Sequence, residues 1–154
     1  MRYFTKELWA NINDENAAVR TQAEKQWALN SQAYQREFDT VRKQLSRNFM
    51  KEFLCRNGLH DYIISEISVK EKGRKYFCEM MLTDGLETVV LVMRELQAFS
   101  LNVESFQQCV MGKLAWGYSE FALTEDHGIS LSVLCDFQNE LCFQFHSLTL
   151  SQAD

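Results

Sequence analysis

The sequence contains no proline, and its six glycines are scattered singly along 154 residues. Proline is a common device for stopping strands and rigidifying loops, so other residues must make the turns of this chain. Isolated glycines do not build a glycine-rich phosphate loop, which argues against the common nucleotide-binding motifs. No apolar run has the length of a membrane-spanning helix, and the polar N-terminus lacks the apolar segment of a signal peptide. We therefore expect a cytoplasmic protein that does not enter a membrane.

Cysteine and histidine are too dispersed to indicate a metal site. The cysteines are odd in number, widely spaced and without a Cys-x-x-Cys pair. This pattern argues against a disulfide framework and against a zinc site. We expect mostly buried, reduced thiols, no metal and no cofactor. The cysteines are Cys55, Cys78, Cys109, Cys135 and Cys142.

Basic residues are missing from the end of the chain. No Lys or Arg follows Lys113, although the net charge of the whole chain is only −5. The basic residues of the N-terminal half are interleaved with acids and lack a stacking platform, so we do not expect nucleic-acid binding. An acidic face of this kind can attract a basic protein partner by electrostatic steering. The acidic residues predicted to bind it are Glu120, Glu125, Asp126, Asp136 and Glu140.

The chain is organised around a long helical stretch at residues 13–57. Its apolar and aromatic residues recur every three or four positions, which is the spacing of one helix face. A face of this kind packs on a core, and its heptad pattern is too short for a stable coiled coil. The residues of this stripe are Trp27, Ser31, Tyr34, Phe38, Val41, Leu45, Phe49 and Phe53.

The ends of this stretch carry capping residues. Asn13 or Asp14 can accept hydrogen bonds from the first turn, and Gly58 can take the left-handed conformation that ends a helix. Unbroken, the helix would be about 60 Å long. We therefore expect a helix that projects past the sheet, or a break near Asn30-Ser31, where helix propensity is weakest. A short helix should precede it, with Thr5 as its N-cap.

From residue 62 the apolar pattern alternates with a period of two, which is typical of strands. Lys72-Gly73 and Asp84-Gly85 suit hairpin turns, so residues 62–98 are predicted to form a three-stranded antiparallel meander. Both turns deliver the same apolar face to the core. The predicted pairs include Val69 with Tyr76, Ile67 with Cys78, Met80 with Val89 and Cys78 with Leu91.

The rest of the chain is predicted to form a short helix at 102–111, ended by Gly112, and strands at 115–123, 129–137 and 141–150. Burial favours a three-residue loop that pairs Phe137 with Leu141 and Cys135 with Phe143. Cys135 and Cys142 then point to opposite faces and form no disulfide. The fold class is α+β: one domain at 1–154, with a long N-terminal helix within 5–57, continuous or broken, packed on an antiparallel meander of about six strands at 62–150.

The one adjacent histidine-carboxylate pair is His60-Asp61. Such pairs serve metal-dependent hydrolases, but a metal needs at least three protein ligands, and only His127 and His146 remain as histidines. The alternative is structural, with His60 or Asp61 capping the chain as it passes from helix to strand.

The opening Met1-Arg2-Tyr3-Phe4-Thr5-Lys6-Glu7-Leu8, the following helix, the Leu59-His60-Asp61 sequence and the strand-rich C-terminal half resemble a family of uncharacterised small proteins from Gram-positive bacteria. The resemblance implies a bacterial origin and no activity. The charge-rich long helix is where this chain departs from that pattern.

These observations lead to three functional hypotheses. The first is a non-enzymatic cytoplasmic protein-binding protein, of the immunity type, that neutralises a basic toxin domain with its acidic C-terminal half. The second is a small metal-dependent or small-molecule enzyme centred on His60-Asp61. The third is an oligomeric scaffold, since the second face of the meander is partly apolar and leaves a homo-oligomer open.

Overall fold

The computed structural model describes residues 1–136 and 139–153. Each of its N-terminal helices begins after a residue whose side chain caps the first turn. Helix α1, Lys6–Ile12, begins after Thr5, whose side chain accepts a hydrogen bond from the Leu8 N–H at 3.2 Å, as predicted. Helix α2, Ala17–Val41, begins after Asn16 rather than after Asn13 or Asp14. The side-chain oxygen of Asn16 accepts from the backbone two residues on, so this residue takes the capping role.

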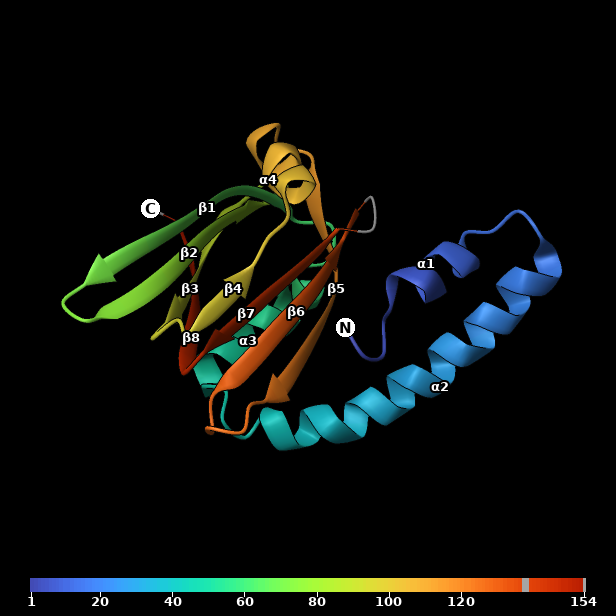
Figure 1. Ribbon diagram of the computed structural model, residues 1–154, viewed down its shortest axis with the longest axis horizontal. Coiled ribbons are helices and arrows are strands. Elements are labelled where there is room, and N and C mark those ends of the chain that lie inside the picture. The colour runs from blue at the N-terminus through green and yellow to red at the C-terminus, as the bar shows by residue number, and fades with distance from the viewer. Residues whose placement is uncertain (137–138, 154) are drawn as a thin grey trace.

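The long helical stretch is broken, but between Val41 and Arg47 rather than at Asn30-Ser31. Helix α3, Arg47–Cys55, begins after Ser46, whose hydroxyl accepts from the Phe49 N–H at 3.1 Å. This local hydrogen bond competes with continuation of the helix. Asn30 lies within α2, and its side-chain amide donates to the Tyr3 carbonyl at 2.7 Å. The first part of α2 projects past the sheet with α1 beside it (Figure 1).

The described residues form one eight-stranded antiparallel sheet, two strands more than the sequence predicted. One extra strand is a short edge at Ala98–Ser100, and the predicted strand 141–150 is two strands separated at His146. The order across the sheet is β4-β7-β6-β5-β1-β2-β3-β8. The strands are β1 Ile63–Lys72, β2 Lys75–Thr83, β3 Thr88–Arg94, β4 Ala98–Ser100, β5 Leu114–Leu123, β6 Ile129–Cys135, β7 Glu140–Phe145 and β8 Ser147–Gln152.

The meander β1–β3 is confirmed, but its register is shifted by two residues. Val69 pairs with Cys78 rather than Tyr76, and Met80 pairs with Leu91 rather than Val89. The two-residue loop is residues 73–74, and the second loop spans residues 84–87, held by the Asp84 carboxylate. A shift of two keeps the same side chains facing the core.

The β6–β7 hairpin is also shifted, by four residues, so that Leu131 pairs with Phe143. The predicted pairing of Phe137 with Leu141 lies partly outside the described residues. Leu141 pairs instead with Val133. Cys135 and Cys142 are both free thiols, as expected, Cys135 buried and Cys142 half-buried.

The core is built by α3 packed against both halves of the sheet. Phe49 and Phe53 of α3 contact the Phe121 ring of β5 at centroid distances of 6.0 and 5.7 Å. The same helix contacts β8, which forms one edge of the sheet. In the described residues the two halves pair with each other through β1 and β5, at residues 63–64 and 114–115, and the chain also passes from one half to the other at His146, between β7 and β8. No helix in the described part of the chain has the length and apolar character needed to cross a membrane.

The predicted short helix is α4, Val103–Val110, with Asn102 as its N-cap and Gly112 following in a left-handed conformation. It contacts β1 and β5, close to the place where the two halves of the sheet meet (Figure 1). A single 3-10 turn, η1 at Asn57–Leu59, joins α3 to the loop that leads into β1.

Candidate functional site

Glu120 holds the protein's own N-terminal segment. Its side chain lies on β5, and the residue is only 8% exposed. The two carboxylate oxygens accept hydrogen bonds from the backbone N–H groups of residues 2–4 at 2.6–2.7 Å. Three N–H groups converging on one carboxylate form a nest for the negative charge. This predicted binding residue is therefore engaged inside the molecule.

The aromatic side chains around Phe4 complete this anchor. Phe4 is buried, and its ring lies 4.8 Å from Trp27 and 5.5 Å from Tyr34 on α2, measured between centroids. On the sheet side it lies 5.8 Å from Tyr118. The N-terminal segment is thus clamped between α2 and β5, where it links the projecting helices to the sheet.

Glu125 and Asp126 lie exposed in the turn between β5 and β6. The Asp126 carboxylate accepts a hydrogen bond from the Thr124 hydroxyl at 2.5 Å and from the Gln97 amide at 2.6 Å. These donors stabilise the ionised form and lower the pKa of Asp126 to about 2. An Asp carboxylate is ionised at neutral pH in any case, and the two hydrogen bonds hold it in one position.

These residues border an open hollow of about 700 Å³. Its lining offers carboxylate, amide and hydroxyl groups and contains no Lys or Arg. Such a lining is suited to a cationic group, because most of its side chains can accept hydrogen bonds. The Gln97 amide nitrogen also lies 3.2 Å from His146 Nε2, which places this histidine at the same cluster. The lining residues are Gln97, Leu123, Thr124, Glu125, Asp126, Ser130 and Gln144.

Asp136 and Glu140 lie at the other end of β6 from this turn. The seven residues of β6, at about 3.3 Å each, place the two ends about 20 Å apart. Glu140 forms an ion pair with the amino group of Met1, so it too engages the N-terminal segment. Asp136 is exposed. The structure thus brings Glu125 and Asp126 together but separates them from the other three predicted acids.

His60 and Asp61 contact each other at the surface. His60 Nδ1 lies 3.0 Å from Asp61 Oδ2, and the imidazole ring lies edge-on to Tyr118 at 5.1 Å. The backbone here is unusual, since residues 57–59 and Asp61 all have positive φ. Such conformations cost energy in residues other than glycine and cluster at functional sites. The Asp61 side chain is nevertheless 86% exposed, so water competes for its carboxylate.

A second hollow, of about 430 Å³, opens beside His60. Phe53 and Tyr118 give it apolar walls, and Ser119 adds a hydroxyl. Within the described structure, no hydrogen bond joins Ser119 to His60, and no group of three His, Cys, Asp or Glu side chains is placed to hold a metal ion. An imidazole beside a carboxylate has the chemistry of a general base toward a small molecule. The Ser119 hydroxyl, however, is not hydrogen-bonded to the imidazole and so is not placed as its nucleophile.

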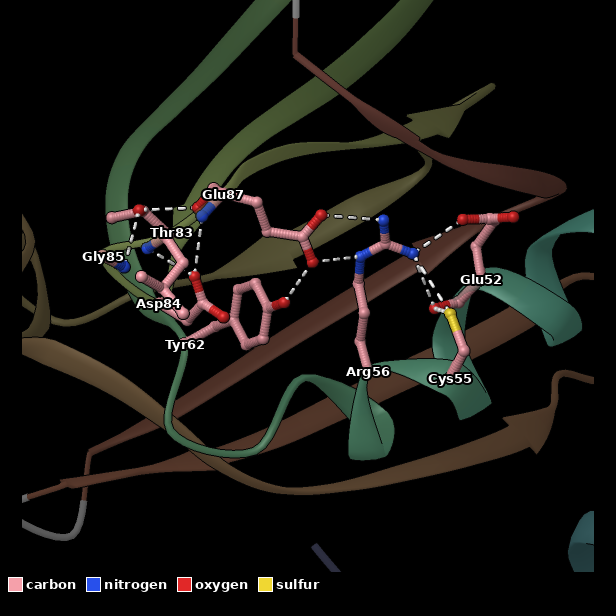
Figure 2. Close-up of polar contacts among 9 residues, drawn as sticks. Glu52, Cys55, Arg56, Tyr62, Thr83, Asp84, Gly85 and Glu87 are labelled. Atoms are coloured by element: carbon pink, nitrogen blue, oxygen red, sulfur yellow. Dashed lines mark hydrogen bonds and ion pairs between the residues drawn. The ribbon is translucent and has the colours of Figure 1, made fainter.

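Sequence reasoning missed a polar network around Arg56 (Figure 2). The Glu87 carboxylate accepts two hydrogen bonds from the Arg56 guanidinium and one from the Tyr62 hydroxyl. Arg56 also donates to Glu52 at 2.6 Å. The Glu52–Arg56 spacing of four is visible in the sequence as a helix pair, but the partner in the β2–β3 loop is not. The network is satisfied internally and fixes the end of α3.

The orientation of α4 is a second feature that the sequence did not reveal. Val103, Phe106 and Val110 share one face of the helix, and they are 74%, 55% and 70% exposed. The buried face carries Ser105 and Cys109 instead. The spacing indicated an apolar face but not which way it points.

Comparisons of this chain with protein-family models, with curated proteins and with solved structures gave no match. The resemblance to small proteins of Gram-positive bacteria stays a prediction. The function has to be inferred from the residues of the site.

Proposed function

We propose that this chain is a non-enzymatic protein-binding protein that engages a basic partner through its acidic C-terminal half. The observation that carries the proposal is the fixed charge of Asp126 at the edge of the hollow between β5 and β6. Its carboxylate is held by Thr124 and Gln97, and its pKa is lowered to about 2. A carboxylate that is already held in one position suits a charge-assisted hydrogen bond from a Lys or Arg side chain, because less ordering is needed on binding.

The surroundings of Asp126 support the same assignment. Glu125 is exposed beside it, and Gln144 and Ser130 line the hollow with further acceptor atoms. The lining of the hollow contains no Lys or Arg that could neutralise the site. Electrostatic complementarity of this kind raises association rates and rejects acidic competitors.

The role that fits is of the immunity type, in which a small acidic protein neutralises a basic toxin domain. A bacterial origin and a cytoplasmic location belong to the same proposal. Glu120 and Glu140 contribute indirectly, because they fix the N-terminal segment against the sheet that carries the site.

A second candidate is an enzyme that acts on a small molecule at His60-Asp61. The observation in its favour is the close contact of His60 with Asp61 on a turn with positive φ angles, beside a hollow. It ranks second because Asp61 is highly exposed and the neighbouring Ser119 is not bonded to the imidazole. If this candidate function is right, wild type should bind a small ligand that His60→Ala does not bind.

The test is a pull-down from lysate of the source organism with three proteins: wild type, Glu125→Gln/Asp126→Asn and Asp136→Asn. Both variants keep the size of the side chains and remove charge. We expect wild type and Asp136→Asn to capture the same basic protein at low salt and to lose it at high salt. The double variant should capture at least tenfold less. Equal capture by all three proteins, or an empty pull-down with folded wild type, would overturn the proposal.

A further inference from the structure

The side-chain amide of Gln97 connects Asp126 to His146. Its nitrogen lies 2.6 Å from Asp126 Oδ2 and 3.2 Å from His146 Nε2. An ionised carboxylate only accepts hydrogen bonds, so the amide atom that faces Asp126 has to be the nitrogen and not the oxygen. The two hydrogens of one NH2 group are therefore shared between a carboxylate and an imidazole ring.

The contact with His146 requires a neutral imidazole. Nε2 can accept a hydrogen bond only when it carries no proton, so the proton of the neutral ring lies on Nδ1. Protonation of the ring adds a hydrogen to Nε2, and two donors then face each other at 3.2 Å. Either the Gln97 amide has to turn its oxygen toward the ring, away from its bond to Asp126, or the imidazole has to move.

The backbone keeps these side chains within bonding distance. The Gln97 N–H donates to the Gln144 carbonyl at 2.8 Å, and the His146 N–H donates to the Arg94 carbonyl at 3.1 Å. The Gln97, Asp126 and His146 side chains are exposed, so solvent protons reach the ring. The arrangement is thus fixed at its base and open to changes in pH.

Charged side chains of both signs lie on the segments around His146. The end of β3 and the residue after it carry an arginine and a glutamate, and a lysine of β2 pairs with this glutamate at 2.7 Å. The hydrogen bond from the lysine is the main cause of the lowered pKa of the glutamate, and the charge of His146 contributes to it. The β5–β6 turn adds two exposed carboxylates, whereas residues 141–153 carry no Asp, Glu, Lys or Arg. The five charged residues are Lys75, Arg94, Glu95, Glu125 and Asp126.

We propose that His146 makes the Asp126 site sensitive to pH, so that the site binds a cationic side chain while the imidazole is neutral and releases it when the imidazole is protonated. The inference rests on the proposed function and names a regulation of the same site. Histidine is the side chain that ordinarily changes its charge between pH 5 and 8.

Two effects of protonation act in the same direction. The first is on Gln97, because the amide that holds Asp126 in place loses its acceptor at the ring. The second is electrostatic, because a positive charge appears beside Gln97, which lines the hollow. That charge repels a Lys or Arg of the partner and competes with it for Asp126. Binding should therefore weaken as the pH falls.

The first test is NMR of the full chain, which needs no partner. At pH 8 the imidazole nitrogen signals of His146 should show a proton on Nδ1 and none on Nε2. As the pH falls to 5, the Gln97 amide and the Asp126 carboxyl signals should shift with the midpoint of His146. Asp126 itself does not titrate there, since its pKa is lowered to about 2. A neutral ring with its proton on Nε2, or signals that do not follow His146, would overturn the inference.

The second test measures binding with a fluorescent peptide of alternating Lys and Ser, because the natural partner is not identified. A peptide with Glu in place of every Lys controls for non-specific binding. Lys stays protonated from pH 5.5 to 7.5, so a change in affinity over this range comes from the protein. By anisotropy at one low salt concentration, wild type should bind the Lys peptide about fivefold more weakly at pH 5.5 than at pH 7.5.

Two variants assign the effect to one histidine. His146→Gln should lose the pH dependence, because glutamine takes up no proton in this range. His127→Gln is the matched control, since it removes a histidine next to Asp126 and leaves the two Gln97 contacts in place. It should keep the fivefold change, and thermal unfolding should show that both variants are folded. Equal wild-type affinity at both pH values, or an unchanged pH dependence in His146→Gln, would overturn the inference.

The outcomes also separate this inference from the proposed function. Lys-peptide binding that is weakened by Glu125→Gln/Asp126→Asn but equal at both pH values would overturn the role of His146 and leave the proposed function standing. A Lys peptide that binds at neither pH, together with an empty pull-down, would overturn the proposed function and the regulation that rests on it. Binding lost at pH 5.5 in wild type and His127→Gln, but kept in His146→Gln, would support both.

Discussion

Arg56 and Glu87 are joined by two parallel hydrogen bonds, from Nε to Oε1 at 2.8 Å and from Nη2 to Oε2 at 3.0 Å. Only 12% of the Arg56 side chain is exposed, and the Tyr62 hydroxyl donates to the same carboxylate at 2.6 Å. The end of α3 is therefore fixed to the loop between β2 and β3 (Figure 2). Such a two-pronged pair is stronger and more directional than a single ion pair.

Replacing Glu87 with Gln should make stability less dependent on pH. The Arg56 guanidinium and the Tyr62 hydroxyl lower the pKa of Glu87. A lowered folded pKa contributes stability that is present above the unfolded pKa of about 4.3 and is lost as pH falls through the folded pKa. Glu87→Gln should therefore lower the Tm by a few degrees at pH 7, and the difference from wild type should shrink below about pH 4.

Calorimetric scans of both proteins at several pH values would measure this difference. Glu24→Gln on the exposed side of α2 is a suitable control and should match wild type throughout. A Tm difference that is the same at pH 3 and pH 7 would show that the carboxylate charge is not what Arg56 recognises.

Replacing Thr124 with Val should raise the pKa of Asp126. The Thr124 hydroxyl is the main cause of the lowered pKa, and the Gln97 amide is the second. Without the hydroxyl, the pKa should move from about 2 toward the ordinary value of about 3.9. The carboxyl carbon shift of Asp126, followed by NMR against pH, measures this directly. Ser130→Ala keeps both donors to Asp126 and should leave the titration unchanged, whereas an unchanged curve in Thr124→Val would contradict the assigned cause.

The cysteines should differ widely in reactivity. Cys55 is exposed, whereas burial raises the pKa of Cys78 and Cys135 to about 12. A thiol reagent at pH 8 acts on the thiolate, so it should modify Cys55 in the folded protein and leave these two unmodified until the chain unfolds. Mass spectrometry of peptides after short exposure would identify the modified positions. Equal labelling with and without denaturant would show that the strands around Cys78 and Cys135 open readily.

Local sequence signals predicted the elements well where the signal and its partner lie close together. The Thr5 cap and the short helix ended by Gly112 are both present. The face of the meander was also predicted, although each hairpin is shifted by two residues. Alternation fixes which side chains share a face but cannot fix register, because every shift of two preserves it. The turn residues then decide the register. In the β2–β3 hairpin, the Asp84 carboxylate holds a loop that is longer than the predicted one.

The candidate site depends on relationships that no local pattern contains. The sequence predicts that Glu120 is a surface acid. Nothing in its own strand shows that residues 2–4 fold back onto its carboxylate. The apolar face of α4 was visible, but its direction is set by Ser105 contacting Asn139, a residue 34 positions away. Glu125 and Asp126 lie together because they are adjacent in one turn, and their role in binding stays a prediction.

Removing the Glu120 carboxylate should release the N-terminal segment without removing a binding charge. In Glu120→Ala the N–H groups of residues 2–4 lose their acceptor, and each hydrogen bond to a charged group contributes about 1.5–3 kcal/mol. We expect a loss of about 3 kcal/mol or more in unfolding free energy, and faster amide exchange at Tyr3 and Phe4. Trp27 fluorescence should change as well, because Phe4 packs against its ring.

Glu125→Ala is the matched control, since it removes an exposed acid of the same strand-and-turn unit and leaves the N-terminal contacts intact. It should keep the stability and amide exchange of wild type while weakening capture of a basic partner. Glu120→Ala should show the reverse under conditions where it stays folded. If Glu120→Ala instead retained slow exchange at Tyr3 and Phe4, the carboxylate would not be the anchor of this segment. The two variants therefore distinguish an acid that maintains the fold from an acid that we propose contacts a partner.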